Sequence, residues 1–154
     1  MWRATRRVMR QPLRKLLALG PAGWGDLARA QIALARSQWR LRREPIGRLA
    51  IREVVGPDEV RGDAARALEL AVAVERVAEF GVLRPFCLVR AMALRDLLLA
   101  AGIEGASIRV GVRRRQGQFE AHAWVRWGDT VLGDRPEFIT QFTEVDDLGV
   151  LGRS

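Results

Sequence analysis

The chain has 154 residues, of which 49% are apolar, and a formal net charge of +8 at pH 7. This length and apolar content suit one domain with a real core and argue against disorder. A single cysteine excludes an intrachain disulfide, and with only one histidine it is a poor basis for a zinc site, so we expect no metal or cofactor. We expect a reducing, cytoplasmic location and no transmembrane segment, because there is no run of about 18 uncharged apolar residues.

The positive charge comes almost entirely from arginine, since Lys15 is the only lysine among 26 basic residues. The arginine clusters are short: Arg6–Arg7, Arg42–Arg43 and Arg113–Arg115. They lack interleaved aromatic residues and any known nucleic-acid-binding motif. The pattern therefore favours a solvated basic surface and gives no reason to expect nucleic acid as a partner.

The first 60 residues are predicted to be helical and to dock on a core formed by residues 61–154. Residues 1–19 mix arginine with apolar residues, which is typical of a basic amphipathic helix that docks on its own domain, on a membrane surface or on a partner. A second helix is expected to begin near Trp24. Spacings of three and four predict that one face of it packs on the core. That face comprises Trp24, Ala28, Ile32, Ala35 and Trp39.

Two further helices are predicted in the core region. Asp63 is a candidate N-cap for a helix to Phe80, with Gly81 as its stop. Its expected buried side comprises Ala67, Leu70, Ala71, Val74, Val77 and Ala78. The next helix begins near Cys87 and ends at Gly102, a residue that favours the left-handed C-terminal position. Its expected buried stripe comprises Leu88, Ala91, Leu94, Leu98 and Ala101.

Beyond residue 106 the apolar residues alternate, which predicts strands over 107–112, 119–127 and 130–134. Residues 113–118 are expected to form a polar hairpin loop, and 127–129 a tight turn. Residues 135–154 are expected to form a covering segment with a frayed end. Helices followed by an antiparallel sheet indicate an α+β fold.

Cys87, His122 and Asp134 are the candidate catalytic residues. A thiol in the first turn of a helix lies near unpaired N–H groups and the positive end of the helix dipole, which favour the thiolate. A cysteine nucleophile needs a base, and an imidazole base needs a carboxylate to orient it. If the turn at 127–129 has three residues, His122 lies opposite Asp134 and can hydrogen bond to it. A two-residue turn would place Asp134 on the other face.

Each of these residues also has a structural interpretation. Free cysteine is often a small buried apolar residue, so Cys87 could simply belong to the core. His122 could be a surface or structural residue, and Asp134 could be a turn carboxylate. Asp129 is a rival partner for the histidine, although its expected place at a turn tip favours a structural role.

Four stretches together resemble a known family: CLVRAMALRDLLLAAGI (87–103), GV (111–112), AHAWV (121–125) and GD (133–134). Over about residues 64 to 142 the chain resembles the transglutaminase-like leader peptidases of lasso peptide biosynthesis, and in particular the stand-alone peptidase half of the split B protein. The resemblance implies a transglutaminase-like (papain-like) core with the nucleophile at a helix N-terminus packed on a small antiparallel sheet. It also implies a Cys-His-Asp peptidase that removes the leader from a precursor peptide.

The resemblance further implies partners. The freed core peptide would pass to a separate ATP-dependent macrolactam cyclase, and a separate protein would bind the leader. The helical first 60 residues agree with this, because they show no winged-helix pattern. Papain-like enzymes often place a glutamine shortly before the cysteine, but residues 79–86 contain none. The Cys87 N–H is thus one expected oxyanion donor and the second is unassigned.

The same residues are compatible with two other functions. A transglutaminase-like acyl transferase would use the same three residues but pass the acyl group to an amine. A non-catalytic adaptor would use the basic N-terminal region to bind a peptide, a membrane or nucleic acid. Cys87 and His122 far apart in the fold would favour the adaptor.

Overall fold

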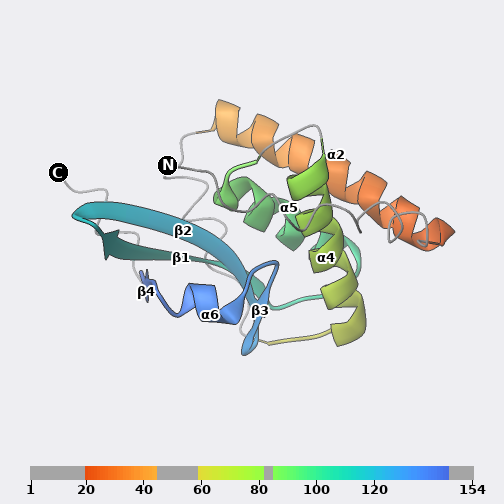
Figure 1. The fold of residues 1–154 in the computed structure, drawn as a ribbon. Coiled ribbons are helices and arrows are strands. Elements are labelled where there is room, and N and C mark those ends of the chain that lie inside the picture. The colour runs from red at the N-terminus through yellow and green to blue at the C-terminus, as the bar shows by residue number, and fades with distance from the viewer. Residues whose placement is uncertain (1–19, 45–58, 82–84, 146–154) are drawn as a thin grey trace, which may run out of the picture.

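The computed structural model describes residues 20–44, 59–81 and 85–145 (Figure 1). The predicted helix in residues 1–19 and the end of the predicted covering segment lie outside these residues. The elements, in chain order, are α2 (Pro21–Arg43), α4 (Ala64–Phe80), α5 (Cys87–Ala100), β1 (Ala106–Arg115), β2 (Gln118–Trp127), β3 (Thr130–Leu132), α6 (Pro136–Ile139) and β4 (Thr143–Glu144). Helices precede an antiparallel sheet, so the chain has the expected α+β fold.

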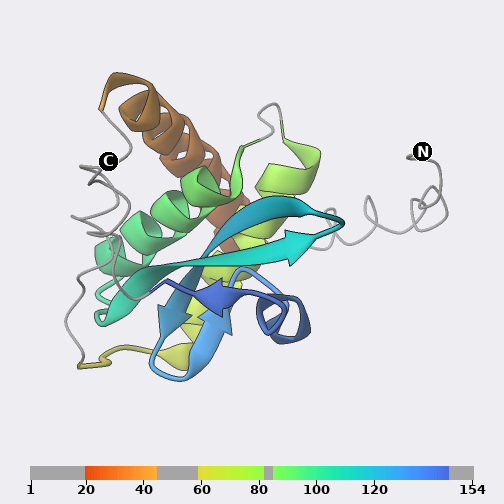
Figure 2. The same cartoon turned by 90° about the vertical axis from the view of Figure 1, so that its left-hand side faces the viewer.

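The four-stranded sheet has the order β3-β2-β1-β4 and separates two sets of elements. Helices α2, α4 and α5 lie together on one side of it, whereas α6 lies on the other side (Figures 1 and 2). The main core lies between α5 and the sheet and contains Ala123 and Val125 of β2. Side chains of β2 that point the other way therefore meet α6.

Helix α5 is the central helix, because the sheet covers one side of it and α2 and α4 cover others. Of its predicted stripe, Ala91, Leu94 and Leu98 are buried and Leu88 is half-buried. Ala101 is exposed, because the helix ends at Ala100. Residues on its other sides are also buried: Val89, Met92, Ala93 and Leu97. An apolar sequence around the whole helix is what a helix enclosed on several sides requires.

The ends of α4 and α5 follow the sequence prediction. Asp63 caps α4 by accepting a hydrogen bond of 2.9 Å from the backbone N–H of Ala65. The predicted buried side of α4 is buried except for Ala78, which is half-buried. Gly102 follows α5 with φ +74°, the left-handed conformation that glycine adopts without strain.

The predicted face of α2 is wrong. Trp24, Ile32 and Trp39 are 51–59% exposed. The buried residues of α2 are Asp26, Ala30, Ala33, Leu34 and Ser37. Small residues let α2 approach α4 and α5 closely, and the buried carboxylate of Asp26 pairs with the Arg66 guanidinium of α4 at 2.5 and 2.6 Å. The spacing of the two tryptophans correctly predicted a helix, but the face that carries them is exposed and not buried.

Both hairpin turns are tighter than the sequence predicted. Strands β1 and β2 continue to Arg115 and Gln118, so Arg113–Arg115 belong to a strand and the loop is Gln116–Gly117. Both loop residues have positive φ, +50° and +82°, as a two-residue type I′ turn requires. Similarly, Trp127 pairs with Thr130, so the second turn has two residues instead of three.

Strand β3 is also shorter than predicted, because it ends at Leu132 and not at Asp134. The segment after it forms α6 and β4, the covering segment expected beyond Asp134. On the helical side, Ala30, Ala33 and Leu34 of α2 belong to the same buried cluster as residues of α4 and α5. The division of the chain at residue 60 stays a prediction. Within the described ranges, no helix is long and apolar enough to cross a membrane.

Candidate active site

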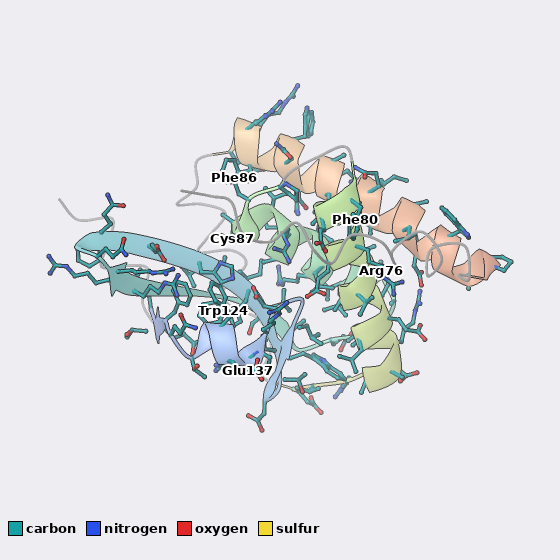
Figure 3. All side chains as sticks on the ribbon, in the orientation of Figure 1. Arg76, Phe80, Phe86, Cys87, Trp124 and Glu137 are labelled. Atoms are coloured by element: carbon teal, nitrogen blue, oxygen red, sulfur yellow. The ribbon has the colours of Figure 1, made fainter. Side chains whose placement is uncertain are left out.

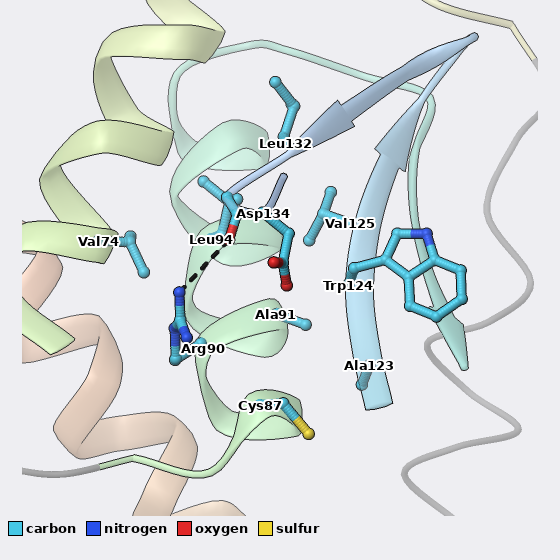
Figure 4. A pocket seen from close by; sticks show the side chains of 11 residues that line it. Val74, Cys87, Arg90, Ala91, Leu94, Ala123, Trp124, Val125, Leu132 and Asp134 are labelled. Atoms are coloured by element: carbon cyan, nitrogen blue, oxygen red, sulfur yellow. Dashed lines mark hydrogen bonds between the residues drawn. The ribbon is translucent and has the colours of Figure 1, made fainter. Parts of the chain in front are cut away.

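Cys87 is the first residue of α5, where the helix meets the sheet (Figure 3). The preceding residue, Phe86, caps the helix without a side-chain hydrogen bond, so the first N–H groups of the helix have no side-chain acceptor from the cap. The thiol is half-buried and lies beside Ala123 of β2 (Figure 4). Cys87 is therefore neither sealed in the core nor fully in solvent.

His122 of β2 contacts the carboxylate of Asp134, with 2.5 Å between Nε2 and Oδ2. Their side chains are only 15% and 17% exposed. The imidazole lies among three aromatic rings, those of Trp124, Phe138 and Phe142, with centroids 5.2–6.2 Å away. These rings hold the imidazole in one orientation and shield its contact with Asp134 from water.

Trp124 fits beside His122 because Gly111 lies opposite His122 on β1. A Cβ atom on Gly111 would lie 2.7 Å from the Trp124 ring and 2.8 Å from the Phe142 Cβ. Real Cβ atoms do not approach other atoms so closely. The glycine therefore provides the space that the aromatic residues around His122 occupy.

Asp134 reaches His122 although it does not belong to β3. The chain leaves the strand after Leu132, and Gly133 adopts φ +72°. This turn brings the Asp134 side chain into contact with His122 and into the pocket that Cys87 also lines (Figure 4). The backbone N–H of Arg135 donates to Oδ1 of Asp134 at 3.1 Å, so both carboxylate oxygens have a partner.

Arg90 fixes the same segment from α5. It lies three residues after Cys87 and donates a hydrogen bond of 3.4 Å to the carbonyl oxygen of Gly133. Its positive charge also favours the ionised form of Asp134. Arg90 thus connects the helix that begins at Cys87 to the turn that holds the Asp134 carboxylate.

The pKa values of the three groups shift in complementary directions. The hydrogen bond to Asp134, followed by that to Cys87, raises the pKa of His122 to about 9. Burial alone would raise the pKa of Cys87, but hydrogen bonds from His122 and from the Ala123 and Leu88 backbones lower it overall. Burial likewise opposes ionisation of Asp134, yet the bond to His122 and the neighbouring charges lower its pKa. These directions favour a thiolate–imidazolium pair next to a carboxylate.

This arrangement suits Cys87 to the role of a nucleophile, His122 to that of a proton donor and Asp134 to that of a group that orients the imidazole. Because Nε2 of His122 faces Asp134, Nδ1 is the nitrogen left for the sulfur. A thiolate can attack an acyl carbon, and an adjacent imidazolium can protonate the leaving group. Among the residues that the structure describes, no group of three or more His, Cys, Asp and Glu side chains is placed to hold a metal ion.

The structure brings together all three predicted site residues, Cys87, His122 and Asp134. Asp129, the rival partner, lies exposed in the β2–β3 turn. The sequence reasoning missed Arg90 and the aromatic residues Phe138 and Phe142. Arg90 is in the same stretch as Cys87, one helical turn later on the same side, so its spacing could have identified it. Nothing in the local sequence indicates that Phe138 and Phe142 contact His122.

One of the comparisons with known proteins identifies a family. The chain matches the family described as the transglutaminase-like superfamily over residues 27–146, a range that includes Cys87, His122 and Asp134. No curated protein and no solved structure matches the chain.

Proposed function

Because the chain belongs to the transglutaminase-like superfamily, we propose that it is a cysteine peptidase that removes the leader from a lasso peptide precursor. The observation that supports this most directly is the arrangement of Cys87, His122 and Asp134 at the junction of α5 and the sheet. The sequence resemblance to the stand-alone peptidase half of the split B protein supports the choice of substrate.

In the proposed reaction, the Cys87 thiolate attacks the carbonyl carbon at the leader–core junction. The negative charge that develops on the carbonyl oxygen is stabilised by the Cys87 backbone N–H at the helix N-terminus. His122 then gives its proton to the leaving amine as the C–N bond breaks, which leaves a thioester. Water, deprotonated by His122, attacks the thioester and restores the thiolate. Asp134 keeps His122 oriented and stabilises its charged form.

We also propose the partners that this function requires. A separate protein presents the leader, and the freed core peptide is consumed by an ATP-dependent macrolactam cyclase. The acyl-transferase alternative uses the same three residues and ends with an amine, not water, as the acceptor. The half-buried nucleophile beside an imidazole disfavours a purely adaptor role, because an adaptor needs no such group.

The test is leader release from a lasso peptide precursor, in the presence of a leader-binding protein. We expect cleavage by the wild type, its loss in Cys87→Ala and His122→Ala, and a smaller loss in Asp134→Ala, because an orienting residue contributes less than the nucleophile. Asp129→Ala is the matched control, since this second aspartate lies in the exposed β2–β3 turn, and the variant should cleave normally.

Mass spectrometry of the products separates the reactions. Hydrolysis adds one water across the cut bond, whereas acyl transfer joins two chains. Normal cleavage by Cys87→Ala would end the peptidase proposal, and a joined product would replace it with the acyl transferase.

A further inference from the structure

The backbone of β2 directs a row of its polar groups away from the rest of the sheet. The Val110 carbonyl of β1 accepts a hydrogen bond of 2.8 Å from the Val145 N–H, on the β4 side, so the N–H and C=O groups of Val110 point away from β2. Val110 pairs with Ala123, and such a pair exchanges no hydrogen bonds. The N–H and C=O groups of Ala123 therefore point outward, away from β1.

The same alternation gives the direction of the backbone N–H and C=O groups of the neighbouring residues of β2. The N–H and C=O groups of Ala121 and Phe119 point outward like those of Ala123, whereas those of Glu120 and His122 point toward β1. Strand β3 covers the outer side of β2 only from Val125 to Trp127. Within residues 20–44, 59–81 and 85–145, no strand pairs with the outer side of Phe119–Ala121.

This unpaired edge is accessible and leads to the nucleophile. Ala121 is exposed, and Phe119 is 77% exposed. At the inner end of the row, Ala123 and Cys87 line the same pocket (Figure 4), and the outward backbone N–H of Ala123 helps to lower the pKa of the thiol. The hairpin extends beyond the N-terminal end of α5 in both ribbon views (Figures 1 and 2). The row of outward backbone groups, which has no strand partner among the described residues, thus begins beside Cys87 and continues for about 7 Å to Ala121.

We propose that this edge of β2, at Phe119 and Ala121, binds the main chain of an extended peptide substrate as an added strand. The inference rests on the proposed peptidase function and specifies how the site takes its substrate. A peptide that pairs with Ala121 runs along the edge toward Cys87, so its main-chain hydrogen bonds fix the distance of a peptide carbonyl from the sulfur. The occupant is an extended, unfolded stretch of chain next to the scissile bond, because most backbone groups of folded chain are already bonded within its own helices and sheets.

Residue-resolved amide exchange tests the proposal directly. The Cys87→Ala protein binds the precursor peptide without cutting it, in the presence of the leader-binding protein. At a peptide concentration ten times its Kd, exchange of the Phe119 and Ala121 amides should slow about tenfold. The Glu120 and His122 amides, already bonded within the β1–β2 ladder, serve as internal controls and should change little. Unchanged exchange at Phe119 and Ala121 under saturating peptide would refute the added strand.

A second experiment uses activity. Ala121→Pro removes one outward N–H and leaves the β1–β2 ladder intact, and proline is tolerated at such edge positions. We expect KM for the precursor to rise about two- to tenfold, because the variant loses about one hydrogen bond to the substrate. The value of kcat should change less. In a series of precursors, each N-methylated at one residue beside the cut, cleavage should weaken at every second methylated position, because only alternate N–H groups of a strand point toward its partner.

The outcomes separate the two proposals. A wild-type protein that does not release the leader contradicts the peptidase function itself. A wild type that cleaves normally, combined with a folded Ala121→Pro variant of unchanged KM and no alternation in the N-methyl series, leaves the peptidase intact and overturns strand addition alone.

Discussion

Nε2 of His122 lies 2.5 Å from Oδ2 of Asp134, although these residues do not face each other in the β2–β3 ladder. The ladder pairs Val125 with Leu132, so a continued strand would place Asp134 opposite Ala123 and turn its side chain to the wrong face. The contact exists because the strand stops at Leu132 and Gly133 turns the chain. It depends on a local turn, and not on strand register.

Gly133→Ala should disturb the site as well as the fold. Its φ of +72° strains any residue with a Cβ, and that Cβ would lie 3.0 Å from the Leu94 side chain. We expect the free energy of unfolding to fall by about 1–2 kcal/mol and leader cleavage to drop with it. Urea denaturation and cleavage kinetics measure the two effects.

Gly117→Ala provides the matched control for Gly133. Gly117 has φ +82°, and a Cβ there meets nothing within 4 Å, at the far end of the β1–β2 hairpin. The free energy of unfolding of Gly117→Ala should fall about as much as that of Gly133→Ala. The rate of Cys87 alkylation should nevertheless depend on pH as it does in the wild type, whereas in Gly133→Ala this dependence should change. If both variants alter that pH dependence equally, Gly133 does not position Asp134.

The coupled titration of Cys87 and His122 sets the expected pH profile. The active pair needs an ionised thiol and a charged imidazole, so kcat/KM should rise through the lowered pKa of Cys87 and fall as pH passes about 9, the raised pKa of His122. Asp134→Asn removes the largest cause of the raised His122 pKa, so the alkaline limb should move to lower pH. An unmoved alkaline limb would show that another group determines it.

The same raised pKa links His122 to stability. A histidine whose pKa is raised on folding stabilises the fold fully below its ordinary value of 6.5, and this contribution is lost as pH rises through about 9. Thermal melting between pH 6 and pH 10 should therefore show a smaller alkaline decline in His122→Gln than in the wild type.

Arg90→Met should impair the site through Asp134. It removes the hydrogen bond to the Gly133 carbonyl and a positive charge that lowers the Asp134 pKa. We expect slower cleavage and a lower His122 pKa, seen as a shift in the alkaline limb of kcat/KM. Arg95→Met is the control, because Arg95 lies on the same helix and donates to the Ala106 carbonyl at 3.3 Å, away from the three residues. Equal effects of both substitutions would indicate a general loss of packing.

The Asp26–Arg66 pair should make a larger contribution to stability than other ion pairs of α2. The Asp26 side chain is 8% exposed and that of Arg66 31%, and the two form a bidentate pair. Asp26→Ala leaves a partly buried guanidinium without its partner and should cost about 2 kcal/mol. Because the Asp26 pKa is lowered, mainly by Arg66, its contribution is present above pH 3.8 and is lost as pH falls through the lowered value.

Asp96→Ala is the matched control for Asp26. It breaks a pair of similar length, 2.8 Å, between Arg40 of α2 and Asp96 of α5, but both side chains are about one-third exposed. Such a pair contributes about 0.5 kcal/mol. Denaturation at pH 7 compares the variants, and equal losses would mean that burial does not strengthen the Asp26 pair.

The two helices next to the site were predictable because their signals are local. Asp63 at a cap, Gly102 at a C-terminus and the apolar period of α4 and α5 depend on neighbours within one turn. The face of α2 was not predictable in this way. Trp24 and Trp39 have the same spacing whether they lie inside or outside, and the choice depended on the approach of α4 and α5 and on Arg66.

The sequence by itself determined the α+β order of elements and singled out Cys87, His122 and Asp134 as candidates, because residue chemistry and hydrophobic period can be read from neighbouring positions. Only the tertiary structure decided how they meet. The turn at Gly133, the contact from Arg90 and the aromatic rings around His122 join residues from separate elements, whose packing no local pattern specifies.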